Sequence, residues 1–211
     1  MDEQSLNFEE FVEKYVKKKN PGYHIFRLIM IPLAHLVYKV KIFGKENIPE
    51  KGGVILAINH IHMPDPVFVL ISTRRLIRYL AKKELLDSPL GFIYRMMACI
   101  PVNREGTSHN AITAAEYALD QGEVIGIFPE GTRNRTRPDD LLPFRYGAVS
   151  MASKTGAKIV PVVLKSNGRP FIDDYRVYIG KAYQIKEDAD LDKENEILRE
   201  KMLQLMKSDS Q

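Results

Sequence analysis

The stretch GVILAINHIHMPDPVF, residues 53–68, joins a continuously apolar run to a polar cluster and then to a helical pattern. A short apolar run without alternation is typical of a strand that is covered on both faces of a sheet. Further β-rich runs follow along the chain, and helical windows separate them. Strands are predicted at 53–59, 76–82, 98–104, 123–130, 159–165 and 175–183, and helices at 66–73, 88–97, 108–121, 145–155 and 192–207. This alternation predicts an α/β fold with a mixed, largely parallel central sheet flanked by helices.

The first 40 residues have a different pattern. Asn7 followed by Glu10 predicts a helix start with reciprocal capping, and NPG at 20–22 ends that helix. The next segment, 23–40, is apolar nearly all round, with Pro32 predicting a kink or a break. Its uncharged part has eleven residues, whereas a bilayer-spanning helix needs about 20. We therefore divide the chain into an N-terminal helix pair, residues 1–40, and a main domain, residues 41–211.

Positive charge is concentrated near the N-terminus. The interval from Lys14 to Lys45 holds eight Lys or Arg residues and no Asp or Glu. Such a block indicates an anionic partner, either nucleic acid or a membrane surface. Basic strands with stacking aromatic residues, which single-stranded nucleic acid favours, are missing, so we expect no nucleic-acid partner. A buried core helix is the alternative for 23–40, but the basic flanks favour an amphipathic helix pair that docks on an anionic membrane.

Composition limits the remaining classes of protein. The 45% of hydrophobic residues can build a sizeable core, and 27% charged residues is ordinary for a soluble surface. The single cysteine, Cys99, cannot form an intramolecular disulfide and is predicted to be a buried thiol. The acidic start lacks the features of a signal peptide. We therefore expect a peripheral or monotopic protein at the cytosolic face of the cell membrane.

Polar clusters follow three of the predicted strands. His60 to Asp65 comes after the first strand, Arg104 after the third and Glu130 to Arg133 after the fourth. In an open α/β sheet, ligands bind outside the carboxyl ends of the strands. The shared placement predicts that these clusters form one site.

The His60 cluster has three interpretations. His60, His62 and Asp65 could bind zinc, but too few further ligands are available to complete a site, so we expect no bound metal. His60 and Asp65 could form an acid/base pair in which the carboxylate orients the imidazole. The third interpretation is a polar turn without a chemical role.

The segment FPEGTR, residues 128–133, has the composition of an anion site. Gly131 allows close approach of a ligand to the backbone, Thr132 offers a hydroxyl, and Arg133 offers a planar fork suited to phosphate. Glu130 could orient Arg133 or accept a hydrogen bond from a substrate hydroxyl. The alternative is a solvated turn with a surface salt bridge.

Together these motifs resemble the four blocks of glycerolipid acyltransferases. Asn59-His60-x4-Asp65, then Arg104, then Phe128 to Arg133, then Val160-Pro161-Val162 occur in the order and spacing of the 1-acylglycerol-3-phosphate acyltransferases of the PlsC type. The resemblance covers about residues 23 to 183. It departs from the usual pattern at His62, Ala98 and Asn134, where serine, glycine and serine are common, respectively.

The resemblance implies roles for individual residues. His60 would be the base and Asp65 its partner. Acceptor phosphate and hydroxyl would be bound by Arg104, Glu130, Gly131, Thr132 and Arg133. Pro161 would shape the acyl or acceptor pocket.

The implied activity is transfer of a fatty acyl group to the sn-2 hydroxyl of 1-acylglycerol-3-phosphate (lysophosphatidic acid), which gives phosphatidic acid in phospholipid biosynthesis. Acyl-CoA or acyl-carrier protein would be the co-substrate, and no other cofactor is expected. Two alternatives remain at this stage. One is acylation of another lyso-lipid or of glycerol 3-phosphate, and the other is a zinc-dependent hydrolase that uses His60, His62 and Asp65.

Overall fold

The computed structural model describes residues 7–18, 20–103, 109–136, 140–167, 169–172 and 174–207. Its described strands form a seven-stranded sheet in the order β1-β7-β6-β2-β5-β3-β4. The strands are β1 (Lys39–Phe43), β2 (Val54–Ile58), β3 (Ile77–Lys82), β4 (Ile100–Val102), β5 (Val124–Ile127), β6 (Lys158–Lys165) and β7 (Asp174–Ile179). All neighbouring strands are parallel except β6 and β7. This confirms the predicted mixed, largely parallel sheet.

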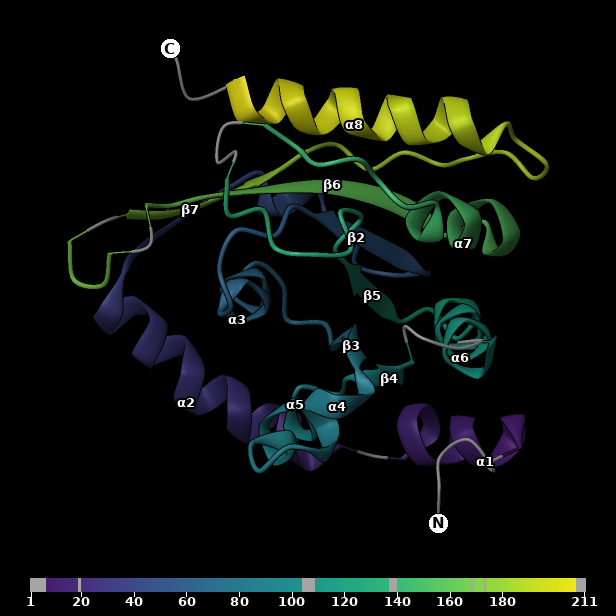
Figure 1. Ribbon diagram of the computed structural model, residues 1–211, viewed down its shortest axis with the longest axis horizontal. Helices are drawn as coiled ribbons and strands as arrows, with labels where there is room; N and C mark the ends of the chain where they lie inside the picture. Colours follow the sequence, from purple (N-terminus) through teal and green to yellow (C-terminus); the bar gives the residue numbers. More distant parts are fainter. Residues whose placement is uncertain are drawn as a thin grey trace.

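Helices cover both faces of the sheet (Figure 1). The helices are α1 (Phe8–Val12), η2 (Glu13–Lys17), α2 (Pro21–Val37), η3 (Lys45–Asn47), α3 (Asp65–Leu70), α4 (Lys83–Asp87), α5 (Gly91–Met96), α6 (His109–Asp120), α7 (Gly147–Thr155) and α8 (Leu191–Lys207). One core cluster joins the sheet to α1, α6, α7 and α8, and a second joins it to α2, α3 and α4. Strand β1 and the short helix α4 were not predicted from the sequence.

Strand β2 shows why the sequence around residue 55 determines this arrangement. Ile55 and Ala57 belong to the first core cluster, whereas Val54, Leu56 and Ile58 belong to the second. All five side chains have zero exposure, because successive side chains of a strand point to opposite faces and both faces are covered by helices. A continuous apolar run is the sequence pattern that such a strand requires.

The two N-terminal helices bury different proportions of their apolar residues. In α1 and η2, which begin with the predicted capping box of Asn7 and Glu10, the side chains of Phe11, Val12 and Val16 are buried in the first core cluster. Arg78 of β3 donates hydrogen bonds to the carbonyls of Tyr15 (2.8 Å) and Val16 (2.6 Å). This helical segment is therefore held against the sheet.

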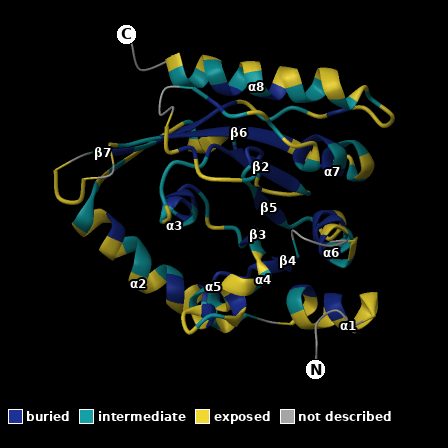
Figure 2. Ribbon diagram, viewed as in Figure 1, coloured by how far each residue is buried: buried dark blue, intermediate teal, exposed yellow. Residues whose placement is uncertain are grey.

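Helix α2 differs from an ordinary amphipathic surface helix, because both its inward and its outward sides are apolar. Tyr23, Phe26 and Ala34 are buried, and the opposite side carries an apolar stripe. Figure 2 shows exposed residues along α2. The stripe consists of Ile25, Leu28, Ile29, Leu33 and Leu36. The helix continues through Pro32, so the predicted break does not occur. Within the described residues, no helix has the length and hydrophobicity needed to cross a membrane.

Parallel pairing brings the carboxyl ends of β2, β3, β4, β5 and β6 to one edge of the sheet. The loop after β2 is linked there to its neighbours. The side chain of Asn59 accepts a hydrogen bond from the amide of Leu164 (2.7 Å) and donates one to its carbonyl (3.1 Å). The amide of Asn134, after β5, donates to the carbonyl of His60 (2.7 Å). The predicted gathering of the β2 and β5 clusters at this edge is confirmed.

Candidate active site

His60 and Asp65 form a side-chain pair at the carboxyl edge of the sheet. His60 is the second residue after β2, and Asp65 is the first residue of α3. Nδ1 of His60 lies 2.7 Å from Oδ2 of Asp65. The imidazole side chain is 19% exposed and the carboxylate is completely buried. One hydrogen-bonded pair thus has a buried member and a member that a substrate can reach.

The turn between the two residues directs its amides toward the Asp65 carboxylate. Oδ2 accepts hydrogen bonds from the amides of Ile61 (2.7 Å) and His62 (3.0 Å), and Oδ1 accepts a longer one from His62 (3.1 Å). The hydroxyl of Tyr175 on β7 also donates to Oδ1. The carboxylate acts only as an acceptor in these bonds, so its bond to His60 requires a proton on Nδ1. That tautomer leaves the lone pair of Nε2 available to accept a proton.

The loop after β5 fixes the position of the His60 ring and main chain. The ring of Phe128 stacks on the imidazole, with centroids 4.2 Å apart. Oε1 of Glu130 accepts a hydrogen bond from the amide of His60 (3.0 Å), and Asn134 donates to the carbonyl of His60. Both polar groups of the His60 backbone therefore bond to the same loop.

Glu130 is buried, and both of its carboxylate oxygens are engaged by backbone amides. Oε1 bonds the amide of His60, and Oε2 accepts from the amide of Leu142 (2.9 Å). Burial raises the pKa of the Glu130 carboxyl, and the two amide hydrogen bonds partly oppose that effect. In this arrangement Glu130 connects the His60 turn to the segment that precedes α7.

The end of the FPEGTR segment lies toward solvent. Thr132 and Arg133 are exposed. Gly131 has φ +67°, which favours glycine, and a Cβ there would lie 2.6 Å from Nε of Arg145. The close approach of Arg145 places a second guanidinium beside the loop that carries Arg133. Arg145 was not among the site residues predicted from the sequence.

The structure does not test one predicted site residue and places another inside the sheet. Arg104 lies outside the described residues. Pro161 is buried within β6, in register with Ala57 of β2, and its carbonyl accepts a hydrogen bond from the amide of Gly180 (2.9 Å). Pro161 therefore belongs to the interior of the sheet rather than to its edge.

His62 has a different environment from His60. Its Nε2 lies 3.2 Å from the carbonyl oxygen of Ser166, just after β6. Across the part of the chain that the structure describes, no three His, Cys, Asp or Glu side chains are grouped as metal ligands. The two histidines of the motif thus have separate partners, a carboxylate for His60 and a main-chain carbonyl for His62.

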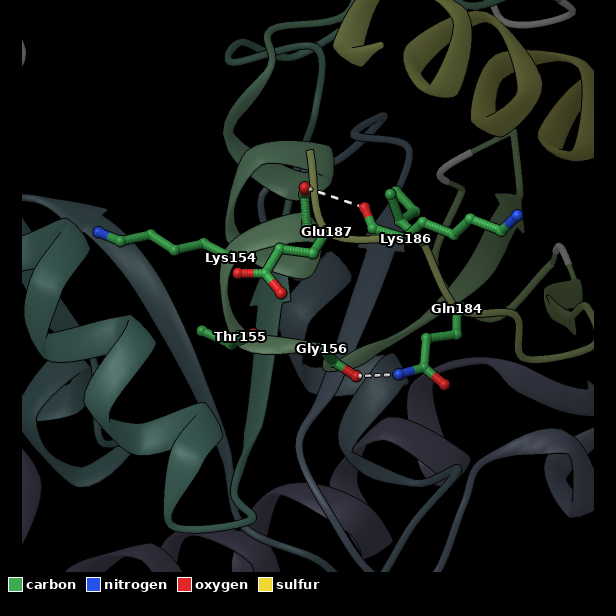
Figure 3. A pocket seen from close by; sticks show the side chains of 8 residues that line it. Lys154, Thr155, Gly156, Gln184, Lys186 and Glu187 are labelled. Carbon is green, nitrogen blue, oxygen red and sulfur yellow. Dashed lines mark hydrogen bonds between the residues drawn. The ribbon is translucent and has the colours of Figure 1, made fainter. Parts of the chain in front are cut away.

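A cavity of about 550 Å³ lies away from this edge. Figure 3 shows two hydrogen bonds across it, from Ser153 Oγ to the carbonyl of Lys186 (3.2 Å) and from Gln184 Nε2 to the carbonyl of Gly156 (3.0 Å). Gly156 precedes the amino end of β6, whereas His60 follows the carboxyl end of β2, which is parallel to β6. The cavity and the His60 pair are therefore at opposite edges of the sheet.

Comparison with known proteins identifies the family. Residues 39–165, from the start of β1 to the end of β6, match the family model described as Acyltransferase. The chain belongs to the acyltransferase family. The acyltransferase match includes His60, Asp65 and the Glu130–Arg133 segment, and it ends before β7.

Curated relatives and a solved structure agree with this assignment. The chain is 40% identical over 139 residues to a 1-acyl-sn-glycerol-3-phosphate acyltransferase of Borreliella burgdorferi, covering 64% of this chain and 54% of the relative. It is 35% identical over 124 residues to the Bacillus subtilis protein of the same name, covering 58% and 60%. The chain spans between half and two thirds of the length of these two relatives.

The crystal structure of the 1-acyl-sn-glycerophosphate (LPA) acyltransferase, PlsC, from Thermotoga maritima has the same fold. The TM-score is 0.72, with 89% of this chain and 79% of that chain covered. Sequence identity in this comparison is 20%, so the likeness establishes the acyltransferase fold. It is consistent with the mixed sheet and the helices on both faces.

Proposed function

We propose that this acyltransferase moves a fatty acyl group from an acyl thioester to the sn-2 hydroxyl of 1-acylglycerol-3-phosphate, which gives phosphatidic acid. The observation that carries the proposal is the His60–Asp65 pair, with its free Nε2 at the partly open edge of the sheet. The names of the curated relatives support the choice of acceptor. Acyl-CoA or acyl-carrier protein would be the co-substrate.

In the proposed reaction His60 acts as the general base. Its Nε2 takes the proton of the sn-2 hydroxyl while the oxygen attacks the thioester carbonyl, and Asp65 stabilises the imidazolium that forms. The tetrahedral intermediate then collapses with cleavage of the carbon–sulfur bond. The thiolate leaves, and the imidazolium returns the proton to sulfur. The proposal needs no cofactor besides the thioester, because a thiolate is a good leaving group.

For the acceptor phosphate we propose the exposed part of the β5 loop, where Gly131, Thr132 and Arg133 provide a close backbone, a hydroxyl and a guanidinium. Arg104, which comes two residues after β4, would contribute a second guanidinium. We propose that Glu130 positions His60 and does not contact the acceptor, because both of its oxygens bond backbone amides. For Pro161 we propose a supporting role in shaping the sheet beneath the site.

We further propose that the protein docks as a peripheral or monotopic protein on the cytosolic face of an anionic membrane through α2. Leu28 and Leu36 on its outward side are 76% and 73% exposed. Beside the end of α2, Phe171 donates its amide to the carbonyl of Val37 (2.6 Å) and exposes 73% of its surface, as does Ile172 at 65%. These residues extend the apolar stripe, and exposed lysines flank it.

A hydrogen bond connects the docking helix to the helix that carries Asp65. Arg27 of α2 donates a hydrogen bond to the carbonyl of Leu70 (2.7 Å), the last residue of the helix that starts with Asp65. Docking through α2 would therefore place the His60 edge close to the bilayer, where a lysophospholipid resides.

The experiment that tests the function uses the purified chain with acyl-CoA or acyl-carrier protein and a panel of lyso-acceptors. Thiol release that depends on 1-acylglycerol-3-phosphate, with phosphatidic acid as product, is the expected result. Thiol release without an acceptor would indicate a hydrolase, and vesicle binding without thiol release would indicate a lipid-binding protein.

A further inference from the structure

Tyr175 is a fully buried tyrosine whose hydroxyl donates a hydrogen bond to Oδ1 of Asp65. It lies on β7, ten residues beyond the end of the acyltransferase match at residue 165. Strand β7 is antiparallel to β6, so its start lies at the edge where the parallel strands end. This reversal of direction brings Tyr175 under the reactive pair.

The ring of Tyr175 is held between two aromatic side chains. Phe68 of α3 stacks on it, with centroids 3.6 Å apart and planes 15° apart, and Tyr38 meets it edge-on at 5.5 Å. Burial and the neighbouring Asp65 carboxylate raise the pKa of Tyr175 well above its ordinary value. The hydroxyl thus remains protonated and is fixed as a donor to Asp65.

The two oxygens of Asp65 have different partners. Oδ2 accepts from the His60 ring, from Ile61 and from His62, whereas Oδ1 accepts from Tyr175 and from the longer bond to His62. A carboxylate that is fixed at Oδ1 cannot rotate, so Oδ2 stays directed at Nδ1 of His60.

We propose that Tyr175 is a positioning residue of the acyltransferase site, which fixes Asp65 and disperses its charge and so sets the pH at which His60 becomes a base. This inference rests on the proposed function of His60. Loss of the hydroxyl would concentrate negative charge on the carboxylate, and the adjacent imidazolium would then keep its proton to higher pH.

The test is Tyr175→Phe, which retains the ring and removes the hydroxyl. We expect the acid limb of the kcat/KM profile to move upward by about 0.5 to 1 pH unit, with the thioester KM little changed. In an Asp65→Asn background the same substitution should change kcat/KM by less than about twofold, because Tyr175 acts through Asp65. A second variant, Tyr175→3-fluorotyrosine, has a stronger donor and should move the limb downward.

Tyr23→Phe is the matched control. Tyr23 has the same zero exposure, but its hydroxyl donates to the carbonyl of Arg75 (3.2 Å) and accepts from the amide of Ile77 (3.0 Å). The Tyr23→Phe substitution should lower the melting temperature and leave the acid limb of the kcat/KM profile at the wild-type pH. A folded Tyr175→Phe protein with the wild-type acid limb would overturn the proposal.

An NMR titration separates this proposal from the proposed function. The imidazole signal of His60, assigned with His60→Gln, should titrate with a higher midpoint in Tyr175→Phe than in wild type. If wild type transferred no acyl group, the function would fail while this midpoint still tested the positioning role. An unchanged midpoint would remove the role of Tyr175 whether or not the enzyme is active.

Discussion

Two parts of the same sheet edge differ in how they are held. The His60–Asp65 pair is enclosed, with the carboxylate completely buried and both backbone groups of His60 hydrogen-bonded to the β5 loop. Thr132 and Arg133, a few residues along that loop, are exposed. One part is fixed before substrate arrives, and the other lies open to solvent.

The difference corresponds to the work that each part is proposed to do. Proton transfer requires a fixed geometry, because a general base must meet its proton at hydrogen-bond distance. A cation that binds phosphate can stay hydrated until the anion arrives, and burying it earlier would be costly. Changes in the enclosed part should therefore reduce turnover, and changes in the open part should weaken acceptor binding.

The largest effect is expected for the enclosed pair. General-base catalysis contributes about 10²- to 10⁴-fold in rate. His60→Ala should therefore lower kcat by at least about 10²-fold, and the variant should still fold. Asp65→Asn should also be severe, because an amide nitrogen would face hydrogen-bond donors and the wrong imidazole tautomer would be stabilised. Single-turnover thiol release measures the effect of each variant on the rate, and thermal unfolding measures its effect on stability.

His62→Ala is the matched control for His60→Ala. His62 bonds a main-chain carbonyl through Nε2, so its loss should change kcat by less than about tenfold. Equal damage from the two histidine substitutions, together with zinc in the purified protein, would contradict the acid/base proposal and favour the hydrolase.

Local patterns predicted much of this structure, for physical reasons that particular residues illustrate. The turn and the helix start that follow His60 depend on contacts within a few residues, and the same holds for the capping box of Asn7 and Glu10. The hydrogen bonds of Glu130 to backbone amides were not predicted, since its side chain was expected to orient Arg133 or to bind the substrate hydroxyl. Its actual partners are backbone amides, which carry no signature in sequence.

Tyr175 shows the second limit of local patterns. Its partner Asp65 is 110 residues away, and the contact depends on β7 running antiparallel beside β6. Neither the strand order nor the reversed direction of β7 could be deduced from the apolar run at 175–183. The different environments of α1 and α2 were not predicted either. Both segments have an apolar face, and the sequence does not show which of these faces packs against the sheet.

The next effect in size concerns the open part of the edge. A charge-assisted contact contributes about 1.5–3 kcal/mol, so Arg133→Ala should raise the acceptor KM by about ten- to a hundredfold and leave the thioester KM nearly unchanged. Lysine should restore only part of the affinity, because it lacks the bidentate fork. The decisive comparison uses an acceptor without phosphate, against which wild type should discriminate far more than Arg133→Ala.

Arg135→Ala supplies the control, since Arg135 is also exposed and lies two residues further along the loop. It should change the acceptor KM by less than about threefold, because a dispersed surface charge contributes little. Equal effects of the two arginines would mean that the loop attracts the acceptor by general charge and holds no defined phosphate site.

Substitutions on the outward side of α2 should affect catalysis less and should mainly weaken binding to the membrane. Burying a leucine in an apolar phase contributes up to about 1.5–3 kcal/mol, so Leu28→Ser with Leu36→Ser should weaken binding to anionic vesicles by about tenfold or more. Ile112→Ser, on the exposed side of α6, should leave binding unchanged. Activity on detergent-dispersed acceptor should be retained in both proteins. Unchanged sedimentation of the α2 variant would place the membrane surface elsewhere.

The smallest effect is expected at Cys99, which sets the baseline for the thiol-release measurements. Cys99 is buried and directly precedes β4. Burial raises the pKa of its thiol to about 12, which leaves only about one thiolate in 10⁴ at pH 8. Native protein should thus react negligibly with an aromatic disulfide reagent, whereas protein unfolded in guanidinium should release one equivalent. Cys99→Ala should keep kcat within about twofold. Rapid labelling of the native chain would show that Cys99 becomes accessible to solvent in the folded protein. Thiol release could then no longer be attributed to the thioester alone.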